Sequence, residues 1–259
     1  MEHNFKKKFG QNFLKDNNIL NKIIDVSNIN DNSLIIEIGA GSGALTEQLV
    51  KKGKVLSYEI DKDLQNLLEE KFKDNDVIFI FDDFLKRNIK EDIKDYKYDH
   101  LYVIANLPYY ITTAIINKIT EEKLDIEKMV LMVQKEVGER FTSKVGTKDY
   151  SSITVFLDYY YDVKKEFLVS KNCFYPVPDV DSMIISLNKK ERDYLKNEEL
   201  FFKLVKDSFQ FKRKTLKNNL KNYDFTKVLE VLEKNGFNES TRAEQIPLEI
   251  YIQISNSLE

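Results

Sequence analysis

An apolar run that leads directly into three closely spaced glycines lies at Leu34-Ile35-Ile36-Glu37-Ile38-Gly39-Ala40-Gly41-Ser42-Gly43. The β-branched residues predict a buried strand, and the pattern of 43–51 predicts a helix after the glycines. Glycines at a strand-to-helix turn let the backbone bend sharply and let a ligand approach main-chain N–H groups. We therefore expect a ligand site in an α/β sheet. For three glycines alone, an ordinary tight turn is the alternative.

The same alternation of short β-rich runs and helical patterns continues along the chain. Expected strands are 34–38, 55–58, 77–81, 101–105, 129–133, 152–161 and 182–187. Expected helices between them are 43–51, 62–72, 86–93 and 111–120. Strands that alternate with helices in this way predict βαβ units in a mostly parallel sheet with helices on both faces.

The pattern changes after Leu187, because residues 198–259 contain helical patterns only, with breaks near Tyr223, Asn235 and Pro247. We therefore expect two domains, a sheet domain over 1–190 and a small all-α domain over 191–259. A tail of about 70 residues is near the lower limit for independent folding, so we expect it to pack on the sheet domain.

The composition excludes several classes of protein. Forty basic and 43 acidic residues give a net charge of −3, which argues against binding nucleic acid by bulk charge alone. Cys173 is the only cysteine, and His3 and His100 are the only histidines, so neither a disulfide framework nor a Cys/His zinc site is expected. No run approaches the roughly 20 apolar residues of a membrane span. We expect a metal-free, soluble, cytoplasmic protein.

Glu59 stands at the end of the second expected strand, 20 residues after Gly39. In doubly wound sheets an acid at this position accepts hydrogen bonds from the ribose hydroxyls of a nucleotide. Asp61, Asp82 and Asp83 add negative charge, which disfavours a pyrophosphate and favours a cofactor with a sulfonium and an amino group. This favours S-adenosylmethionine, although the loop with Ala44 also fits a nicotinamide cofactor site and each acid has an alternative as a helix cap.

The fourth strand leads into Asn106-Leu107-Pro108-Tyr109. Ligands of open α/β sheets bind at the carboxyl ends of strands, so this segment is expected to face the glycine loop. An adenine amine is a poor nucleophile and needs hydrogen-bond acceptors, which the Asn106 side chain and the Leu107 or Pro108 carbonyl offer. Tyr109 offers a face for stacking an extruded base. A proline turn with core-packed tyrosines is the alternative.

These motifs together resemble the ribosomal RNA adenine dimethyltransferases over almost the whole chain, and the small-subunit enzymes in particular. The matching segments are Lys8-Phe9-Gly10-Gln11-Asn12-Phe13-Leu14, 37–43, 106–109, 174–178, 180–182, 211–220 and 242–244. The resemblance implies a seven-stranded, mostly parallel sheet with one antiparallel strand and a helical C-terminal domain. It also implies dimethylation of two adjacent adenines in the 3′-terminal hairpin loop of 16S rRNA.

The resemblance further implies roles for individual residues. The implied cofactor site consists of Gln11, Asn12, Leu14, Gly39, Gly41, Glu59, Asp83 and Asn106. The implied catalytic residues are Asn106, Leu107, Pro108, Tyr109 and Phe174, with Tyr109 and Phe174 on the two faces of the base. Asp83 is chosen over Asp82 because Asp83-Phe84-Leu85 matches the family segment. The implied substrate particle is the immature 30S subunit, and we expect a monomer.

A basic cluster without acids consists of Lys212, Arg213, Lys214, Lys217 and Lys221. Such a cluster suits contact with RNA phosphates, and a solvated helix face is the alternative. The other functional hypotheses are the 23S rRNA methyltransferase of macrolide resistance, a non-catalytic ribosome assembly factor, and a nicotinamide dehydrogenase supported by the glycine loop alone.

Overall fold

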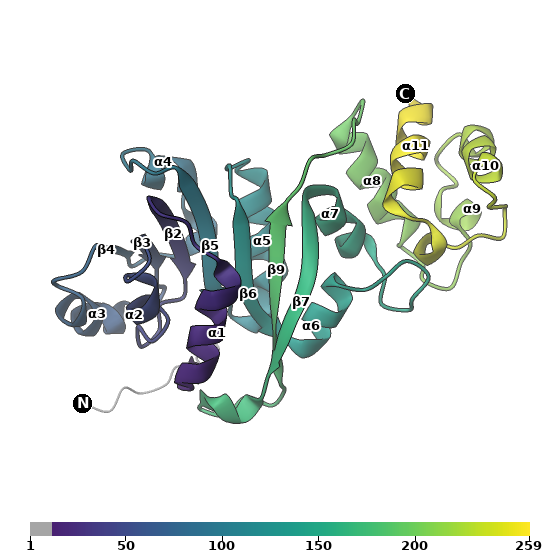
Figure 1. The fold of residues 1–259 in the computed structure, drawn as a ribbon. Helices are drawn as coiled ribbons and strands as arrows, with labels where there is room; N and C mark the ends of the chain where they lie inside the picture. Colours follow the sequence, from purple (N-terminus) through teal and green to yellow (C-terminus); the bar gives the residue numbers. More distant parts are fainter. Residues whose placement is uncertain (1–11) are drawn as a thin grey trace. The chain divides into compact units, whose positions relative to one another are not determined.

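Seven strands form one sheet in the order β4-β3-β2-β5-β6-β9-β7 in the computed structural model, which describes residues 12–259 (Figure 1). Their bounds are Ser33–Ile38 (β2), Lys54–Tyr58 (β3), Val77–Ile80 (β4), His100–Asn106 (β5), Lys128–Gln134 (β6), Tyr161–Val169 (β7) and Ser182–Lys189 (β9). Strands β4, β3, β2, β5 and β6 run parallel, and β9 runs antiparallel to β6. The predicted mostly parallel sheet with one antiparallel strand is confirmed.

Strand β2 is the point where the strand order reverses. It pairs with β3 on one side, with Ile38 opposite Tyr58, and with β5 on the other, with Ser33 opposite His100. All six residues of β2 are buried. Crevices of doubly wound sheets form at such a reversal, outside the carboxyl ends of the strands. The ends of β2, β3 and β5 therefore meet where a ligand site is expected.

Helices cover both faces of this sheet, with α1 in front and α5 behind in the view of Figure 1. The helix bounds are Asn17–Ser27 (α1), Thr46–Leu49 (α2), Gln65–Lys71 (α3), Ile89–Ile93 (α4), Thr112–Glu121 (α5) and Lys135–Phe141 (α6). Leu20 and Ile23 of α1 pack with Ile35, Tyr102 and Val130 of the sheet in one apolar cluster. Burial of this apolar surface is what holds the helix on the sheet.

The chain divides into two compact units. One contains the described residues up to Gly138 together with Lys164–Asn188, and the other contains Glu139–Val163 and Lys189–Glu259. The predicted boundary at 190 placed residues 139–163 in the sheet domain, whereas these residues cluster with the helical unit. The helices of the second unit are Ser152–Tyr160 (α7), Glu198–Ser208 (α8), Leu216–Asn219 (α9), Phe225–Lys234 (α10) and Leu248–Leu258 (α11).

The expected strand at 152–161 is wrong, since residues Ser152–Tyr160 form helix α7. The segment has many β-branched and aromatic residues, and these favour a strand only weakly. A capping box between Ser151 and Thr154 starts the helix instead, and Tyr159 packs against Phe201 of α8 with ring centroids 5.4 Å apart. Tertiary packing and the cap therefore outweigh the local propensity.

The seventh strand, β7, was not expected. It contains Lys164, Lys165 and Glu166 and stands at the end of the strand order. Charged side chains are common on edge strands, because they oppose pairing with another chain, and they also obscure the alternation of apolar residues. A second, small sheet pairs Phe13–Leu14 (β1) antiparallel with Phe174–Tyr175 (β8).

Candidate active site

The glycine loop at the carboxyl end of β2 has a left-handed backbone. Gly41 has φ +56°, and a Cβ at this residue would lie 2.9 Å from the ring of Phe13. A side chain there would therefore be strained and would collide with β1. Gly39 has φ +85°, and its Cβ position would lie 3.6 Å from the carbonyl oxygen of Asn106. The loop thus brings the ends of β2 and β5 close together.

Glu59, which follows β3, holds this loop in place. Its side chain is buried, with Oε2 accepting the Gly41 N–H and Oε1 accepting the Asp61 N–H, both at 2.8 Å. Burial raises the pKa of Glu59, and the two main-chain donors oppose this shift. Each carboxylate oxygen can accept a further hydrogen bond. The acid expected to bind a diol therefore also organises the loop.

Glu37, inside β2, is a second buried acid next to the glycine loop, and it does not line the pocket described below. Its Oε2 accepts hydrogen bonds from the Thr46 and Ser57 hydroxyls at 2.7 Å each, while Oε1 has no partner among residues 12–259. Burial raises the pKa of Glu37 to about 7. The hydrogen bonds of this carboxyl link the start of α2 to β3, next to the glycine loop.

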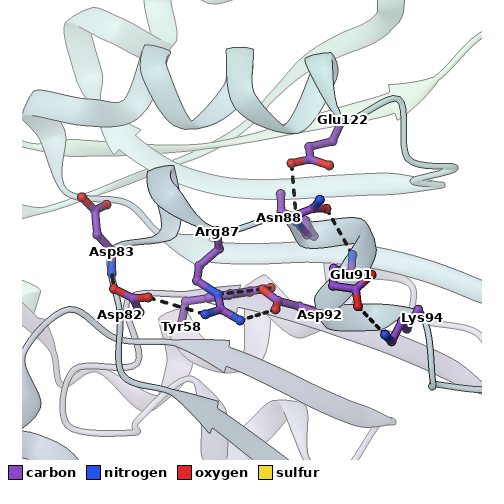
Figure 2. A network of polar contacts seen from close by, with 10 residues as sticks. Tyr58, Asp82, Asp83, Arg87, Asn88, Glu91, Asp92, Lys94 and Glu122 are labelled. Carbon is purple, nitrogen blue, oxygen red and sulfur yellow. Dashed lines mark hydrogen bonds and ion pairs between the residues drawn. The ribbon is translucent and has the colours of Figure 1, made fainter.

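Two neighbouring carboxylates after β4 have different partners (Figure 2). Asp82 accepts the Asp83 N–H at 2.8 Å and lies 3.6 Å from the guanidinium of Arg87. Arg87 also binds Asp92 through two nitrogens, the Nε contact being 3.1 Å long. Asp83 instead caps the 3-10 turn that follows it. Figure 2 shows the Asp83 carboxylate pointing away from this network, so the two acids are not equivalent.

The corner at residues 106–109 follows β5 and has defined polar partners. The Asn106 Nδ2 donates to the Asn12 carbonyl at 3.3 Å, which leaves Oδ1 as an acceptor. The Pro108 carbonyl accepts the Ile111 N–H at 3.2 Å. The side-chain amide is therefore oriented, and of the two carbonyls considered from sequence, that of Pro108 is already engaged in a turn.

Tyr109 is partly buried, and its hydroxyl is hydrogen-bonded to the Ser182 hydroxyl of β9 at 2.7 Å. Burial raises the pKa of Tyr109, so the phenol is neutral at physiological pH. The bond to Ser182 fixes one edge of the ring. Tyr109 is thus suited to present a ring face and not to act as a base.

One pocket joins these elements. Its polar lining includes Glu59 and Asp83, its apolar lining includes Ile60 and Phe84, and the glycine loop and the Asn106 corner complete it. Carboxylates next to apolar side chains suit a ligand with hydroxyl, amino and cationic groups, and they disfavour a pyrophosphate.

Two residues expected at the site do not line this pocket, and a third, Gln11, lies outside the described residues. Leu14 is buried and lines a smaller cavity that shares Phe13 and Gly41 with the pocket. Phe174 is 3% exposed, belongs to the apolar core and does not line the pocket, so this structure does not place its ring at the pocket beside Tyr109. Pairing of β8 with β1 places Phe174 opposite Leu14 and accounts for its burial.

The basic cluster belongs to the second unit. Lys212, Arg213, Lys214 and Lys221 are exposed. Lys217 is different, since its ammonium pairs with Glu239 at 2.7 Å. The cluster therefore presents four cations that are available to a ligand.

Sequence reasoning missed residues that contact the pocket side chains without lining the pocket themselves. Arg87 contacts Asp82 and Ser182 contacts Tyr109, and contacts of this kind depend on which strands are neighbours. Ile60 and Phe84 directly follow Glu59 and Asp83. An apolar residue next to an acid at a strand end is the signal that could have identified these two pocket residues.

Within residues 12–259 there is no cluster of three or more His, Cys, Asp or Glu side chains arranged to hold a metal ion. No helix in the same part of the chain has the length and apolarity needed to span a bilayer.

The strand order, the glycine loop and the acid-lined pocket at the reversal point define an α/β protein built to bind a nucleoside-type ligand. The profile of the ribosomal RNA adenine dimethylase family matches residues 2–259. The chain belongs to this family, and the resemblance predicted from its motifs is confirmed.

Relatives and solved structures agree with this membership. Proteins named Ribosomal RNA small subunit methyltransferase A are 43% identical in Staphylococcus haemolyticus (97% of this chain, 89% of the relative) and 42% identical in Bacillus cytotoxicus (98% and 91%). A dimethyladenosine transferase from Plasmodium falciparum superposes with a TM-score of 0.80 at 28% identity, covering 93% of this chain and 95% of the other. The 23S rRNA methyltransferase ErmE gives a TM-score of 0.75 at 25% identity, with 95% and 99% covered.

Proposed function

We propose that this chain transfers methyl groups from S-adenosylmethionine to the exocyclic amines of two adjacent adenines in the 3′-terminal hairpin loop of 16S rRNA. The observation that carries the proposal is the shared pocket, in which Asn106 and Tyr109 face the glycine loop and Glu59. Family membership and the names of the relatives support the same substrate class.

The pocket lining fits S-adenosylmethionine by the chemistry of its donors and acceptors. When bound, this cofactor supplies an electrophilic methyl group on a sulfonium. Glu59 would accept hydrogen bonds from the ribose hydroxyls, and the acidic wall would favour the cationic end. Gly39 and Gly41 leave the loop without side chains where the ligand approaches. Ile60 and Phe84 would enclose the adenine ring.

Asp83 is the better acceptor for the cofactor's adenine amine. The Asp82 carboxylate is shared between the Asp83 N–H and Arg87. One Asp83 oxygen accepts the Leu85 N–H of the 3-10 turn, and the other oxygen lies 3.6 Å from the ammonium of the exposed Lys86. Both ion pairs are 3.6 Å long and therefore weak, but the Asp83 side chain is the more buried acid, 27% exposed against 48% for Asp82. Asp83 therefore keeps acceptor capacity within the pocket.

The Asn106 corner would orient the target amine. Asn106 Oδ1 and the Leu107 carbonyl would accept its two N–H bonds, because the Pro108 carbonyl already accepts from two donors, the Ile111 N–H and the Thr112 hydroxyl. Two acceptors localise the nitrogen lone pair, which the adenine ring otherwise withdraws, toward the methyl group. The amine oriented in this way would accept the methyl group that the cofactor supplies, and its proton would leave to water.

The Tyr109 ring would stack on the flipped base, a contact worth about 1–3 kcal/mol in comparable platforms. Its hydroxyl bond to Ser182 holds the ring in place before the base arrives. Lys212, Arg213, Lys214 and Lys221 would contact RNA phosphates. We propose that the substrate is the immature 30S subunit and that the enzyme acts as a monomer without metal.

Methyl transfer to undermodified 30S subunits and to 23S rRNA, followed by mass mapping of the modified nucleotides, tests the proposal. We expect dimethyladenosine at two adjacent positions of 16S rRNA with the wild type and none with Asn106→Ala. Methylation of 23S rRNA alone would favour the macrolide-resistance activity. Absence of S-adenosylmethionine binding in calorimetry would favour a non-catalytic assembly factor.

A further inference from the structure

Phe211 is an aromatic residue that the hydrophobic core does not use. It lies in the loop after α8, and its side chain is 55% exposed. Phe209, two residues earlier, packs against the core instead, with its ring 6.1 Å from that of Tyr251. A single exposed apolar residue needs no explanation by itself. The backbone and the charges around Phe211 distinguish it from such a case.

The backbone of Phe211 is held by one side chain. Asn219 Oδ1 accepts the Phe211 N–H at 3.2 Å, and Asn219 Nδ2 donates to the carbonyls of Ser208 and Phe211 at 2.6 and 3.4 Å. The Lys214 N–H also donates to the Phe211 carbonyl at 2.9 Å. These bonds fix the loop, so the exposed position of the ring is built into the structure.

The three residues after Phe211 are Lys212, Arg213 and Lys214, and all three are exposed. Within residues 12–259 none of the three forms an ion pair, whereas Lys217 is paired with Glu239. An aromatic face directly beside free cations matches a single-stranded nucleic acid, in which unpaired bases stack on rings while phosphates meet Lys and Arg. A duplex would keep its bases stacked inside and leave the ring unused.

We propose that residues 210–214 form a stacking platform, on which an unpaired RNA base lies against Phe211 and the adjacent phosphates contact Lys212, Arg213 and Lys214. The choice of RNA as the partner rests on the proposed function. In this platform Phe211 would bind a base, whereas the basic cluster by itself would bind only the phosphate charges of the RNA.

The full chain contains no tryptophan, so Phe211→Trp introduces a single reporter. We expect binding of a decameric oligoadenylate to quench this fluorescence. Tyr194→Trp is the matched control, because Tyr194 is 77% exposed in the same unit but stands beside Asp193. An abasic decamer should not quench F211W. Quenching of both reporters to the same extent, or equal quenching by the abasic strand, would overturn the platform.

Two further variants separate stacking from charge. Phe211→Ala should weaken oligoadenylate binding about tenfold with an unchanged salt dependence, while Phe211→Tyr should retain it. Lys214→Ala should instead make the negative slope of log K against log salt less steep by about 0.7. The inference is wrong if F211A binds as the wild type does. Wild-type methylation of 30S subunits is measured separately, so that failure of the platform and failure of the proposed function remain distinguishable.

Discussion

The Glu59 carboxylate accepts the Gly41 main-chain N–H at 2.8 Å, so the acid that follows β3 also fixes the loop that follows β2. The same hydrogen bond orients the Glu59 carboxylate, which we propose to bind the ribose, before a ligand arrives. Such preorganisation lowers the cost of ordering the site on binding.

Glu59→Gln tests this double role. The amide nitrogen cannot accept a hydrogen bond, so one buried main-chain donor, of Gly41 or Asp61, loses its partner. We expect S-adenosylmethionine affinity to fall at least tenfold and the free energy of unfolding to fall by about 1–3 kcal/mol. Calorimetry and urea unfolding measure the two effects. Glu69→Gln, on the exposed face of α3, is the control, and unchanged affinity in E59Q would contradict the assignment.

We expect Glu37 to make the free energy of unfolding depend on pH. Its pKa is about 7 in the folded protein against 4.5 for the free side chain, so the folded state binds more protons between these values. The stability contribution of this group is complete below pH 4.5 and is lost as pH rises to about 7. The full loss corresponds to about 3 kcal/mol.

Urea unfolding of the wild type and Glu37→Gln at pH 5 and pH 8 checks this expectation. The neutral amide does not titrate, so the wild type should lose stability relative to E37Q as pH rises, while other groups cancel in the difference. A difference between the two proteins that is the same at both pH values would show that Glu37 does not titrate in this range.

The parts of the site that lie on consecutive strand ends could be predicted from sequence. Gly39 and Glu59 each follow a strand with a clear apolar pattern, and Asn106 is the last residue of another, and the doubly wound topology places such ends side by side. The apolar pattern of β2, β3 and β5 is strong because these strands are buried on both faces.

Other features depend on long-range contacts and could not be predicted in this way. Phe174 is buried because β8 pairs with β1, some 160 residues earlier in the chain. Lys217 forms an ion pair with Glu239, which lies 22 residues later in the chain. The segment of α7 is helical because of its cap and its packing on α8. None of these partners is visible in the local sequence.

The Tyr109–Ser182 hydrogen bond predicts coupled effects on turnover. Tyr109→Phe and Ser182→Ala each remove this bond but keep the ring, so we expect each to lower kcat/KM for 30S subunits about threefold to tenfold, the range of one hydrogen bond. The double variant should be no worse than either single variant, because both remove the same contact. Tyr109→Ala removes the ring and should lose considerably more. Additive losses in the double variant would mean that the two residues act separately.

Arg87 provides the last test, because it connects the buried core to the pocket wall that we propose to hold the cofactor's adenine. It joins Asp92, which also accepts the hydroxyl of the buried Tyr58 at 3.0 Å, to Asp82 at the pocket wall (Figure 2). Without the guanidinium, Asp82 is free to move beside Asp83.

We expect Arg87→Ala to weaken binding of S-adenosylhomocysteine about fivefold, as for the loss of a screened ion pair of about 1 kcal/mol. Turnover at saturating cofactor should remain, because the amine is oriented from β5. Binding of S-inosylhomocysteine, which carries a carbonyl oxygen in place of the adenine amine, should change less, since Asp83 cannot accept a hydrogen bond at that position. Lys94→Ala, which removes the exposed Lys94–Glu91 pair at the far side of the network, is the control. Equal losses for both ligands in R87A would show that Arg87 stabilises the fold without positioning Asp83.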